Sequence, residues 1–306
     1  MDPEQTTAAP FCILNGHSVH AEEARALIAR IAGEYGAQAE VVVTKRGDDI
    51  ASLAARAMSE GRHPIVAGGG DGTVNAVAGK LAGGDAVLGV LPMGTLNHFA
   101  KDAGIPLELE AAVRNLFTGH VARVDVGEVN GRVFVNNSGI GLYPHFVRQR
   151  ETQERHGYPK AVAFLLALAA LVRRYLRLRI RARLDEADAL EHVTPFLFVG
   201  NNRYEVSGPS IGTRTTLQAG RLWVCTAPRD VRRSMGRLVR RVLAGRANEE
   251  LRTFETGEIW VDPGTARVSV SADGEVRTMD PPLHYRIRPR ALRVLVPEDQ
   301  WSVASS

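Results

Sequence analysis

The sequence predicts an α/β domain followed by a mostly antiparallel β domain, and three observations lead to this fold class. In roughly the first 120 residues, short apolar runs alternate with stretches whose apolar residues recur every three or four positions, as expected for strands alternating with helices. After that point, short strand-like runs with tight-turn signals between them predominate. The length of 306 residues is about that of two average domains.

Residues 1–124 are expected to form a three-layer α/β domain, in which helices cover both faces of a parallel sheet. Strands are expected at Phe11–Leu14, Glu40–Thr44, Pro64–Ala67 and Ala86–Leu91. Helices are expected at Ala24–Tyr35, Ile50–Ala57, Thr73–Leu81 and Leu107–Thr118. Because ligands of such sheets bind at the carboxyl ends of the strands, a ligand-binding site is expected at the loops after these strands.

Residues 125–306 are expected to form a β-sandwich or flattened barrel, with the last residues free to return to the first domain. Asn130-Gly131 predicts a tight turn between strands Val126–Val129 and Arg132–Asn136. Tyr158–Tyr175 has the spacing of a helix. Further strands are expected at Arg177–Leu184, Thr194–Gly200, Arg221–Thr226, Glu258–Val261, Arg267–Ser271, Leu283–Arg288 and Leu292–Val296.

The composition excludes several classes of protein. With 44% hydrophobic and 24% charged residues, the chain is not of the disordered type. Its two cysteines, Cys12 and Cys225, cannot form a disulfide framework or a four-ligand zinc site, and both are expected to be reduced core residues. The polar start of the chain does not resemble a signal peptide, and the longest apolar run, Ala161–Val172, is too short to span a bilayer. A cytoplasmic protein is expected.

The charge is unevenly distributed along the chain. Residues 1–124 hold 10 Lys and Arg against 14 Asp and Glu, whereas the remainder holds 28 against 20. Arg229–Arg246 combines an apolar helical stripe with seven arginines and a single acid, which suits an anionic membrane surface. An ordinary surface helix with an arginine-rich exposed face is the alternative. No nucleic-acid-binding motif accompanies the charge.

A glycine-rich segment, Gly68–Gly72, connects the third expected strand to the third expected helix. Glycines let the backbone approach a phosphate, and the start of a helix offers N–H groups and a positive dipole end. A tight turn capped by Thr73 would use the same residues without a ligand. This segment alone does not decide between the two.

A second loop repeats the pattern after the next strand. Gly-Thr-x-Asn occurs at Gly72–Asn75 and again at Gly94–Asn97. Neighbouring strands would bring both loops to one edge of the sheet, where each offers N–H groups, a Thr hydroxyl and an Asn amide to a polyphosphate. The glycine spacing is not that of the dinucleotide fingerprint, and no Gly-Lys-Thr/Ser of a Walker loop follows.

These two loops resemble the diacylglycerol kinase catalytic family, which includes bacterial lipid kinases and the sphingosine and ceramide kinases. The similarity rests on Gly69–Thr73 and on Pro92–Ala100, and it continues at Phe134–Gly141 and Asp273–Glu275. It implies a nucleotide-binding α/β domain, a β-sandwich and an active site in the cleft between them. It also implies ATP as the phosphoryl donor and Mg²⁺ bridging the β- and γ-phosphates.

The resemblance assigns roles to individual residues. Asp273 matches the proposed general base, which takes the proton of the acceptor alcohol, and Glu275 would orient that base or bind metal. A hairpin turn at Asp273-Gly274 is the alternative interpretation. Asp71 is the expected protein contact of the metal ion. The nucleotide would be held by Asn15, Thr44, Gly69, Gly70, Asp71, Gly72, Thr73, Asn75, Gly94, Thr95 and Asn97.

Three positions depart from the family pattern. Ala76 replaces a frequent Glu, and His98 replaces a usual Asp. Gln218-Ala219 lacks the Asp that helps to hold an accessory magnesium ion in some members. The nucleotide site is less affected by these changes than the accessory metal site.

The predicted function is an ATP-dependent lipid kinase, with diacylglycerol as the first candidate acceptor, acting at the membrane surface. One alternative is an NAD kinase-like phosphotransferase, because that family shares Gly-Gly-Asp-Gly-Thr. The Pro92–Ala100 loop argues against it. The other alternative is a catalytically weak regulator that binds nucleotide or lipid.

Overall fold

The structure is a computed structural model that describes residues 9–45, 49–141, 178–184, 190–194, 196–207, 210–226 and 251–297. Contacts within the chain divide it into two compact units. The first unit consists of Met1–Val126, Thr216–Gln218 and Arg288–Ser306, and the second of Gly127–Thr215 and Ala219–Ile287. The expected helices at Tyr158–Tyr175 and Arg229–Arg246 lie outside the described residues. The predicted boundary between residues 124 and 125 stays a prediction.

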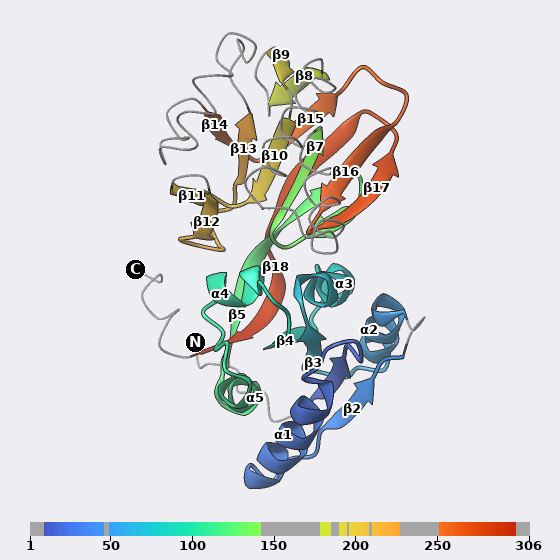
Figure 1. The fold of residues 1–306 in the computed structure, drawn as a ribbon, viewed down its shortest axis with the longest axis vertical. Helices are drawn as coiled ribbons and strands as arrows, with labels where there is room; N and C mark the ends of the chain where they lie inside the picture. The colour runs from blue at the N-terminus through green and yellow to red at the C-terminus, as the bar shows by residue number, and fades with distance from the viewer. Residues whose placement is uncertain are drawn as a thin grey trace, which may run out of the picture. The chain divides into compact units, whose positions relative to one another are not determined.

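The first unit is built on a parallel sheet (Figure 1). Its strands lie in the order β2-β1-β3-β4-β18, and every neighbouring pair is parallel. The last of them is the C-terminal half of β18, which pairs with β4 through Arg293 and Val294. The strands are β1 (Phe11–Leu14), β2 (Glu40–Val43), β3 (Ile65–Gly69), β4 (Val87–Pro92) and β18 (Leu283–Val296).

Helices form two groups against this sheet, because successive strand residues face opposite sides. Cys12 and Leu14 of β1 pack in one core with α1 and α5. Helices α2 and α3 pack against each other and against β3. The three-layer α/β prediction for this part of the chain is therefore confirmed. The helices are α1 (Ala21–Glu34), α2 (Ile50–Ser59), α3 (Asp71–Leu81), α4 (His98–Asp102) and α5 (Leu109–Thr118).

Local signals account for most helix ends in the first unit. The carboxylate of Asp49 accepts a hydrogen bond from Ala51 N and caps α2, and Gly36 takes a φ of +63° just after α1. Helix α3 begins at Asp71, two residues before the predicted start. Gly70 is its N-cap, so Thr73 lies in the first turn and is not the capping residue.

The second unit contains a six-stranded antiparallel sheet in the order β14-β13-β10-β7-β16-β17. The N-terminal half of β18 pairs with β15, β15 pairs with β8, and β8 pairs with β9. The hairpin β5–β6 and the pair β11–β12 complete the described strands. Phe134, Ile140 and Tyr285, together with residues of both sheets, form one core, as expected for a sandwich. The strands not yet given are β5 (His120–Val129), β6 (Arg132–Phe134), β7 (Asn137–Gly141), β8 (Leu178–Leu184), β9 (Leu190–Thr194), β10 (Phe196–Asn201), β11 (Tyr204–Ser207), β12 (Ser210–Arg214), β13 (Leu222–Thr226), β14 (Arg252–Thr256), β15 (Glu258–Asp262), β16 (Val268–Ala272) and β17 (Glu275–Met279).

Both predicted hairpin turns are present. Asn130 and Gly131 have φ values of +46° and +81°, and Asp273 and Gly274 have +47° and +87°. These are the conformations of a two-residue turn between antiparallel strands. Strand β6, however, ends at Phe134 and not at Asn136 as predicted. The next residues leave the ladder because their backbone groups bind the side chains of Asp273, Asn201 and Arg214.

The two cysteines are buried and unpaired, as predicted. Burial raises the pKa of both thiols to about 12, so neither is a reactive thiolate at neutral pH. Among the described residues, no helix is long and apolar enough to cross a membrane.

Candidate functional site

The two glycine loops of the first unit touch each other. Gly69 of β3 pairs with Pro92 of β4, and Met93 N donates to Gly69 O at 3.0 Å. A Cβ atom placed on Gly94 would lie 2.4 Å from the Cα of Gly70. Only a residue without a side chain at position 94 permits this approach, so the two loops form one continuous backbone surface.

The start of α3 lies at this contact. The N–H groups of Thr73 and Val74 donate to Gly70 O. Those of Asp71 and Gly72 have no hydrogen-bond acceptor in the described part of the chain. A Cβ on Gly72 would meet no protein atom within 4 Å. These free donors, with the positive end of the helix dipole, make the loop suited to an anion such as a phosphate.

A third loop, which follows β1, is tied to both glycine loops. Asn15 Nδ2 donates to the hydroxyl of Thr73 at 3.2 Å, and Asn15 Oδ1 accepts from His17 N. Ser18 Oγ donates to Met93 O at 3.1 Å. Ser18 was not a predicted site residue. A serine after a strand end is too common a feature to single it out.

Two of the predicted site residues of the second loop, Thr95 and Asn97, have different surroundings. Asn97, with a φ of +50°, accepts a hydrogen bond from Gly94 N and donates one to Gly94 O. Its amide therefore shapes the loop. Thr95 is exposed beside it. Asp71 reaches across from the first loop, and its Oδ1 accepts from Phe99 N at 3.3 Å in the first turn of α4.

Asn75 is buried in α3, one turn beyond the glycines. Its Oδ1 atom is buried and has no hydrogen-bond partner in the described residues. An unpaired buried amide oxygen is costly unless a ligand, a water molecule or a bound ion provides the missing partner. Its position in α3 is consistent with the predicted role of Asn75 near a bound group.

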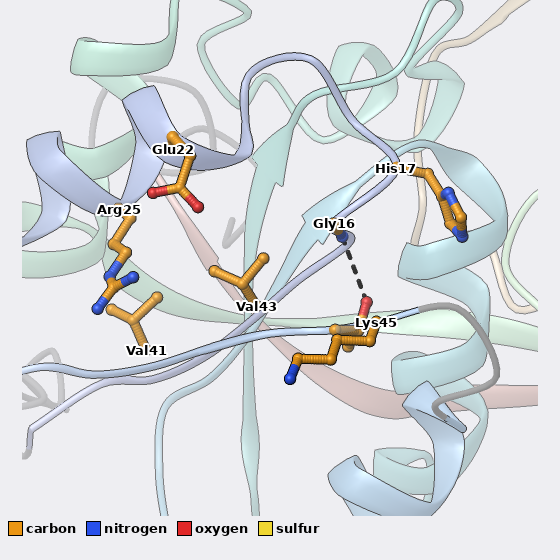
Figure 2. A pocket seen from close by; sticks show the side chains of 8 residues that line it. Gly16, His17, Glu22, Arg25, Val41, Val43 and Lys45 are labelled. Atoms are coloured by element: carbon orange, nitrogen blue, oxygen red, sulfur yellow. Dashed lines mark hydrogen bonds between the residues drawn. The ribbon is translucent and has the colours of Figure 1, made fainter.

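Thr44 lies at the end of β2, beside a cavity of about 560 Å³ (Figure 2). The Thr44 hydroxyl donates to Leu14 O at 3.2 Å and accepts from Gly16 N at 3.3 Å. Glu22 and Arg25 of α1 contribute to the lining of this cavity. The lining residues are Gly16, His17, Glu22, Arg25, Val41, Val43, Thr44 and Lys45. The cavity thus combines an apolar wall from β2 with side chains of both charges.

The carboxylate of Asp273 lies in the second unit and accepts three backbone hydrogen bonds. Val135 N donates to Oδ2 at 2.7 Å, while Asn136 N and Asn137 N donate to Oδ1 at 2.8 and 2.9 Å. Burial raises the pKa of Asp273 from 3.8 to about 6, although these hydrogen bonds and the charge of Arg214 act in the opposite direction. Asp273 is therefore both a turn residue and an oriented carboxylate with a pKa near neutrality.

Glu275 is bound elsewhere. Its carboxylate pairs with Arg132 and Arg277 on the surface of the hairpin. The family resemblance implied that Glu275 would orient Asp273 or bind metal, but in the structure the backbone of Val135–Asn137 orients Asp273.

Sequence reasoning missed the residues that hold Val135–Asn137 from the other side. Arg214 Nη1 donates to Val135 O and Asn201 O, and Arg214 Nη2 donates to Asn136 Oδ1. Asn201 Nδ2 also donates to Val135 O at 2.9 Å. The available signal was the Asn-Asn pair that ends an apolar run in both places, at Asn136 and Asn201.

Magnesium was implied by the resemblance, and among the described residues near the loops Asp71 fits it. Mg²⁺ is commonly held by one or two carboxylates together with substrate phosphates, and Asp71 supplies one carboxylate beside the free N–H groups. The accessory position does not fit. The Gln218 side chain presents an N–H there, and Nε2 donates to Arg123 O at 2.8 Å. No cluster of three or more metal-ligating acids, histidines or cysteines occurs in the residues that the structure describes.

Comparison with known proteins places these loops in a family. Residues 10–129 match the diacylglycerol kinase catalytic domain, and residues 146–296 match the YegS C-terminal NAD kinase beta sandwich-like domain. A protein of Pseudomonas aeruginosa named "Probable lipid kinase YegS-like" is 31% identical over 93% of both chains. A protein of the same name from Pseudomonas fluorescens is 30% identical over 94% of this chain and 95% of its own.

A solved structure supports the fold. The crystal structure of a diacylglycerol kinase from Bacillus anthracis matches with a TM-score of 0.68 at 16% identity, and the match covers 96% of this chain and 98% of that one. The α/β unit followed by the β-sandwich is thus the architecture of that enzyme. The chain belongs to the YegS-like family, and it joins a region that matches the diacylglycerol kinase catalytic domain to a region that matches the YegS C-terminal β-sandwich domain.

Proposed function

We propose that this protein is a lipid kinase that transfers the γ-phosphate of ATP to a lipid hydroxyl, with diacylglycerol as the first candidate acceptor and phosphatidic acid as its product. The observation that carries the proposal is the backbone contact between Gly70 and Gly94, beside the free N–H groups of Asp71 and Gly72. The names of the relatives support a lipid as the acceptor.

The glycine loops would bind the phosphates of the donor. The N–H groups of Asp71 and Gly72 supply hydrogen bonds to phosphate oxygens, and the dipole of α3 favours their negative charge. Mg²⁺ bound with ATP would neutralise charge on the β- and γ-phosphates, and Asp71 would hold it. The cavity beside Thr44 has room for the nucleoside.

Asp273 would act as the general base. The acceptor hydroxyl gives its proton to the carboxylate while its oxygen forms a bond to the γ-phosphorus. The bond from that phosphorus to the β–γ bridging oxygen breaks, and ADP leaves. A carboxyl with a pKa of about 6 is mostly ionised at neutral pH and is still basic enough to accept the proton.

The lipid acceptor implies that the protein works at a membrane surface. The excess of arginine in Arg229–Arg246 supports peripheral contact with anionic lipid. Diacylglycerol, sphingoid bases, ceramide and phosphatidylglycerol all offer a hydroxyl group of the required kind.

A transfer assay tests the proposal. The protein is incubated with γ-labelled ATP, Mg²⁺ and a panel of these lipid alcohols in mixed micelles, with NAD as a further acceptor. Labelled lipid is expected. Label on NAD alone would instead indicate the NAD kinase-like activity, and ATP binding without any transfer would indicate a regulator.

A pair of glycine variants tests the phosphate site itself. Gly72→Ala adds a methyl group that meets no protein atom, so it should weaken ATP binding only if the ligand approaches there. Gly79→Ala, on the same helix and also in open space, is the matched control. We expect Gly72→Ala to raise the Kd for ATP at least about tenfold, as one lost charge-assisted contact implies, and Gly79→Ala to leave it unchanged. Equal affinity in both variants would remove this loop from the site.

A further inference from the structure

The segment Val135–Asn137 connects β6 to β7 in the second unit, and most of its backbone polar groups are bound. Its three N–H groups donate to the carboxylate of Asp273, and Asn137 O accepts from Asp273 N at 2.9 Å. On the other side, Val135 O accepts from Arg214 and Asn201, and Asn136 O accepts from Asn201 N. The segment therefore lies between the Asp273 carboxylate, which binds its N–H groups, and the Arg214 guanidinium, which binds the carbonyl group of Val135.

Arg214 is the cation of this arrangement, and it is only 5% exposed. Its three hydrogen bonds measure 2.6, 3.1 and 2.8 Å, and they involve two different nitrogens of the guanidinium. The group also lies over the ring of Tyr204, with 5.4 Å to the ring centroid. The planar fork of arginine allows this geometry, which a lysine ammonium cannot reproduce. Burial of a cation is unfavourable unless such partners compensate it.

We propose that Arg214 is a positioning residue for Asp273, which fixes the direction of the carboxylate through Val135–Asn137 and keeps it ionised. This inference rests on the proposed role of Asp273 as the base. If Arg214 is lost, Val135 O and Asn136 Oδ1 each lose a donor, and the segment that aims the carboxylate keeps the hydrogen bonds from Asn201 but loses the guanidinium that braces it. The positive charge that favours the ionised carboxylate is lost as well.

The charged side chains that flank the turn of Asp273 on β6 and β17 pair with one another. Glu275 on β17 is bound by Arg132 of β6 and by Arg277 of β17. The contacts that reach the Asp273 carboxylate come from the backbone of Val135–Asn137, and the charge acting on it is that of Arg214. A change at Arg214 should therefore be seen in the titration of Asp273.

Three variants separate charge from geometry. Arg214→Met removes both, Arg214→Lys keeps the charge but loses the fork, and Arg203→Met removes an exposed arginine of the same unit that pairs with Glu255. The dependence of kcat on pH is measured between pH 5 and 9, together with the KM for ATP and the melting temperature.

We expect Arg214→Met to lower kcat at least about tenfold, to leave the KM for ATP within twofold, and to move the acidic limb of the profile upward by at least about 0.5 pH unit. Arg214→Lys should lose kcat while its acidic limb stays near that of the wild type, and Arg203→Met should match the wild type throughout. A fall in kcat and in melting temperature without movement of the acidic limb would overturn the proposal, since it would indicate a purely structural role.

A second measurement does not depend on activity. The pKa of the Asp273 carboxyl is followed by carbon NMR in the ligand-free protein, and its signal is assigned by its absence in Asp273→Asn. We expect a higher pKa in Arg214→Met and an unchanged one in Arg214→Lys. If Arg214→Met does not fold, the Arg214→Lys variant still tests the proposal. An altered Asp273 pKa in that variant would contradict the claim that the positive charge at position 214 is what keeps the carboxylate ionised. If the wild type transfers phosphate to no lipid, the proposed function fails, but this titration still decides whether Arg214 controls Asp273.

Discussion

Gly94 and Gly70 meet backbone to backbone: a Cβ on Gly94 would lie 2.4 Å from the Gly70 Cα, whereas a Cβ on Gly70 would lie 3.4 Å from the Gly94 Cα. The contact is asymmetric. A small side chain at position 70 is nearly tolerated, and one at position 94 forces the loops apart. Position 94 therefore tests the pairing of the loops, while Gly72 tests the approach of the ligand.

Gly94→Ala should weaken ATP binding at least about tenfold, because the added methyl group must separate the two loops that form the phosphate surface. Isothermal calorimetry with ATP and Mg²⁺ measures the affinity. The melting temperature is followed in parallel, with Gly79→Ala as the control for an added methyl group. Unchanged affinity in a folded Gly94→Ala protein would show that the close contact is not needed.

Asp273→Asn should lower kcat by about 10²-fold or more and leave ATP affinity nearly unchanged. Asn is almost the same size and tolerates the positive φ of the turn, so a pure turn role predicts activity close to the wild type. Steady-state kinetics on the best lipid substrate gives the answer. A folded variant that keeps more than about a third of the wild-type kcat would remove Asp273 from the mechanism.

The same carboxyl predicts how stability depends on pH. Its pKa is about 6 in the folded protein against an ordinary value of 3.8, so the folded state binds the proton more tightly than the unfolded chain does. The contribution is fully present below about pH 4 and is lost as pH rises through about 6. We expect the free energy of unfolding of the wild type, relative to Asp273→Asn, to fall over this window by up to about 3 kcal/mol, at about 1.36 kcal/mol per pKa unit. Urea unfolding of both proteins at four pH values measures this. A difference that grows with pH would contradict the sign.

From the hydrogen bond of Gln218 we predict that the ligand-free chain needs no accessory metal ion for its stability. Its side chain already joins the 216–218 segment to Arg123 O, where an acid would be needed to bind a cation. EDTA should leave the melting temperature unchanged within about 1 °C, and Gln218→Ala should cost about 0.5–1.5 kcal/mol. Gln218→Asp is the informative counterpart, because it should become less stable in EDTA than in Mg²⁺ if the position can be converted into a metal site.

Binding to vesicles should increase with their content of anionic lipid and decrease with salt. The reason is the concentration of arginines in Arg229–Arg246. Sedimentation with vesicles compares the wild type with an Arg237→Glu/Arg240→Glu/Arg241→Glu variant. Equal binding of the two proteins at every salt concentration would exclude this segment as the contact.

The sequence was sufficient to predict elements that are determined by local chemistry. The spacing of apolar residues predicted the alternating strands and helices of the first unit. The residue types Asn-Gly and Asp-Gly predicted the turns at Asn130-Gly131 and Asp273-Gly274. The repeated Gly-Thr-x-Asn predicted two loops at one sheet edge, and the register of Gly69 with Pro92 brings them there. What each Asn does could not be predicted, because it depends on a neighbour. Asn97 closes on Gly94, three residues away, whereas Asn15 binds Thr73 from a separate loop.

Arg214 was beyond sequence reasoning for the same reason. Its partners lie 13 to 79 positions away in the chain, and among so many arginines nothing marks it as buried. Asp273 was recognisable as a turn residue from its own neighbours. The three N–H groups that bind its carboxylate lie more than 130 positions earlier, so their role emerges only in the folded chain.

Strand β18 has a consequence for how the protein is made. Arg293 and Val294, near its end, pair with Val87 and Leu88 of β4 and supply the fifth strand of the first sheet. During synthesis, the first 126 residues therefore emerge from the ribosome long before β18, the strand that pairs with β4, has been made. During that interval β4 presents an open edge, the kind of surface that recruits strands from other chains. A fragment that stops at Val126 would keep that edge permanently, so the first unit cannot be produced intact without the last residues of the second half of the chain.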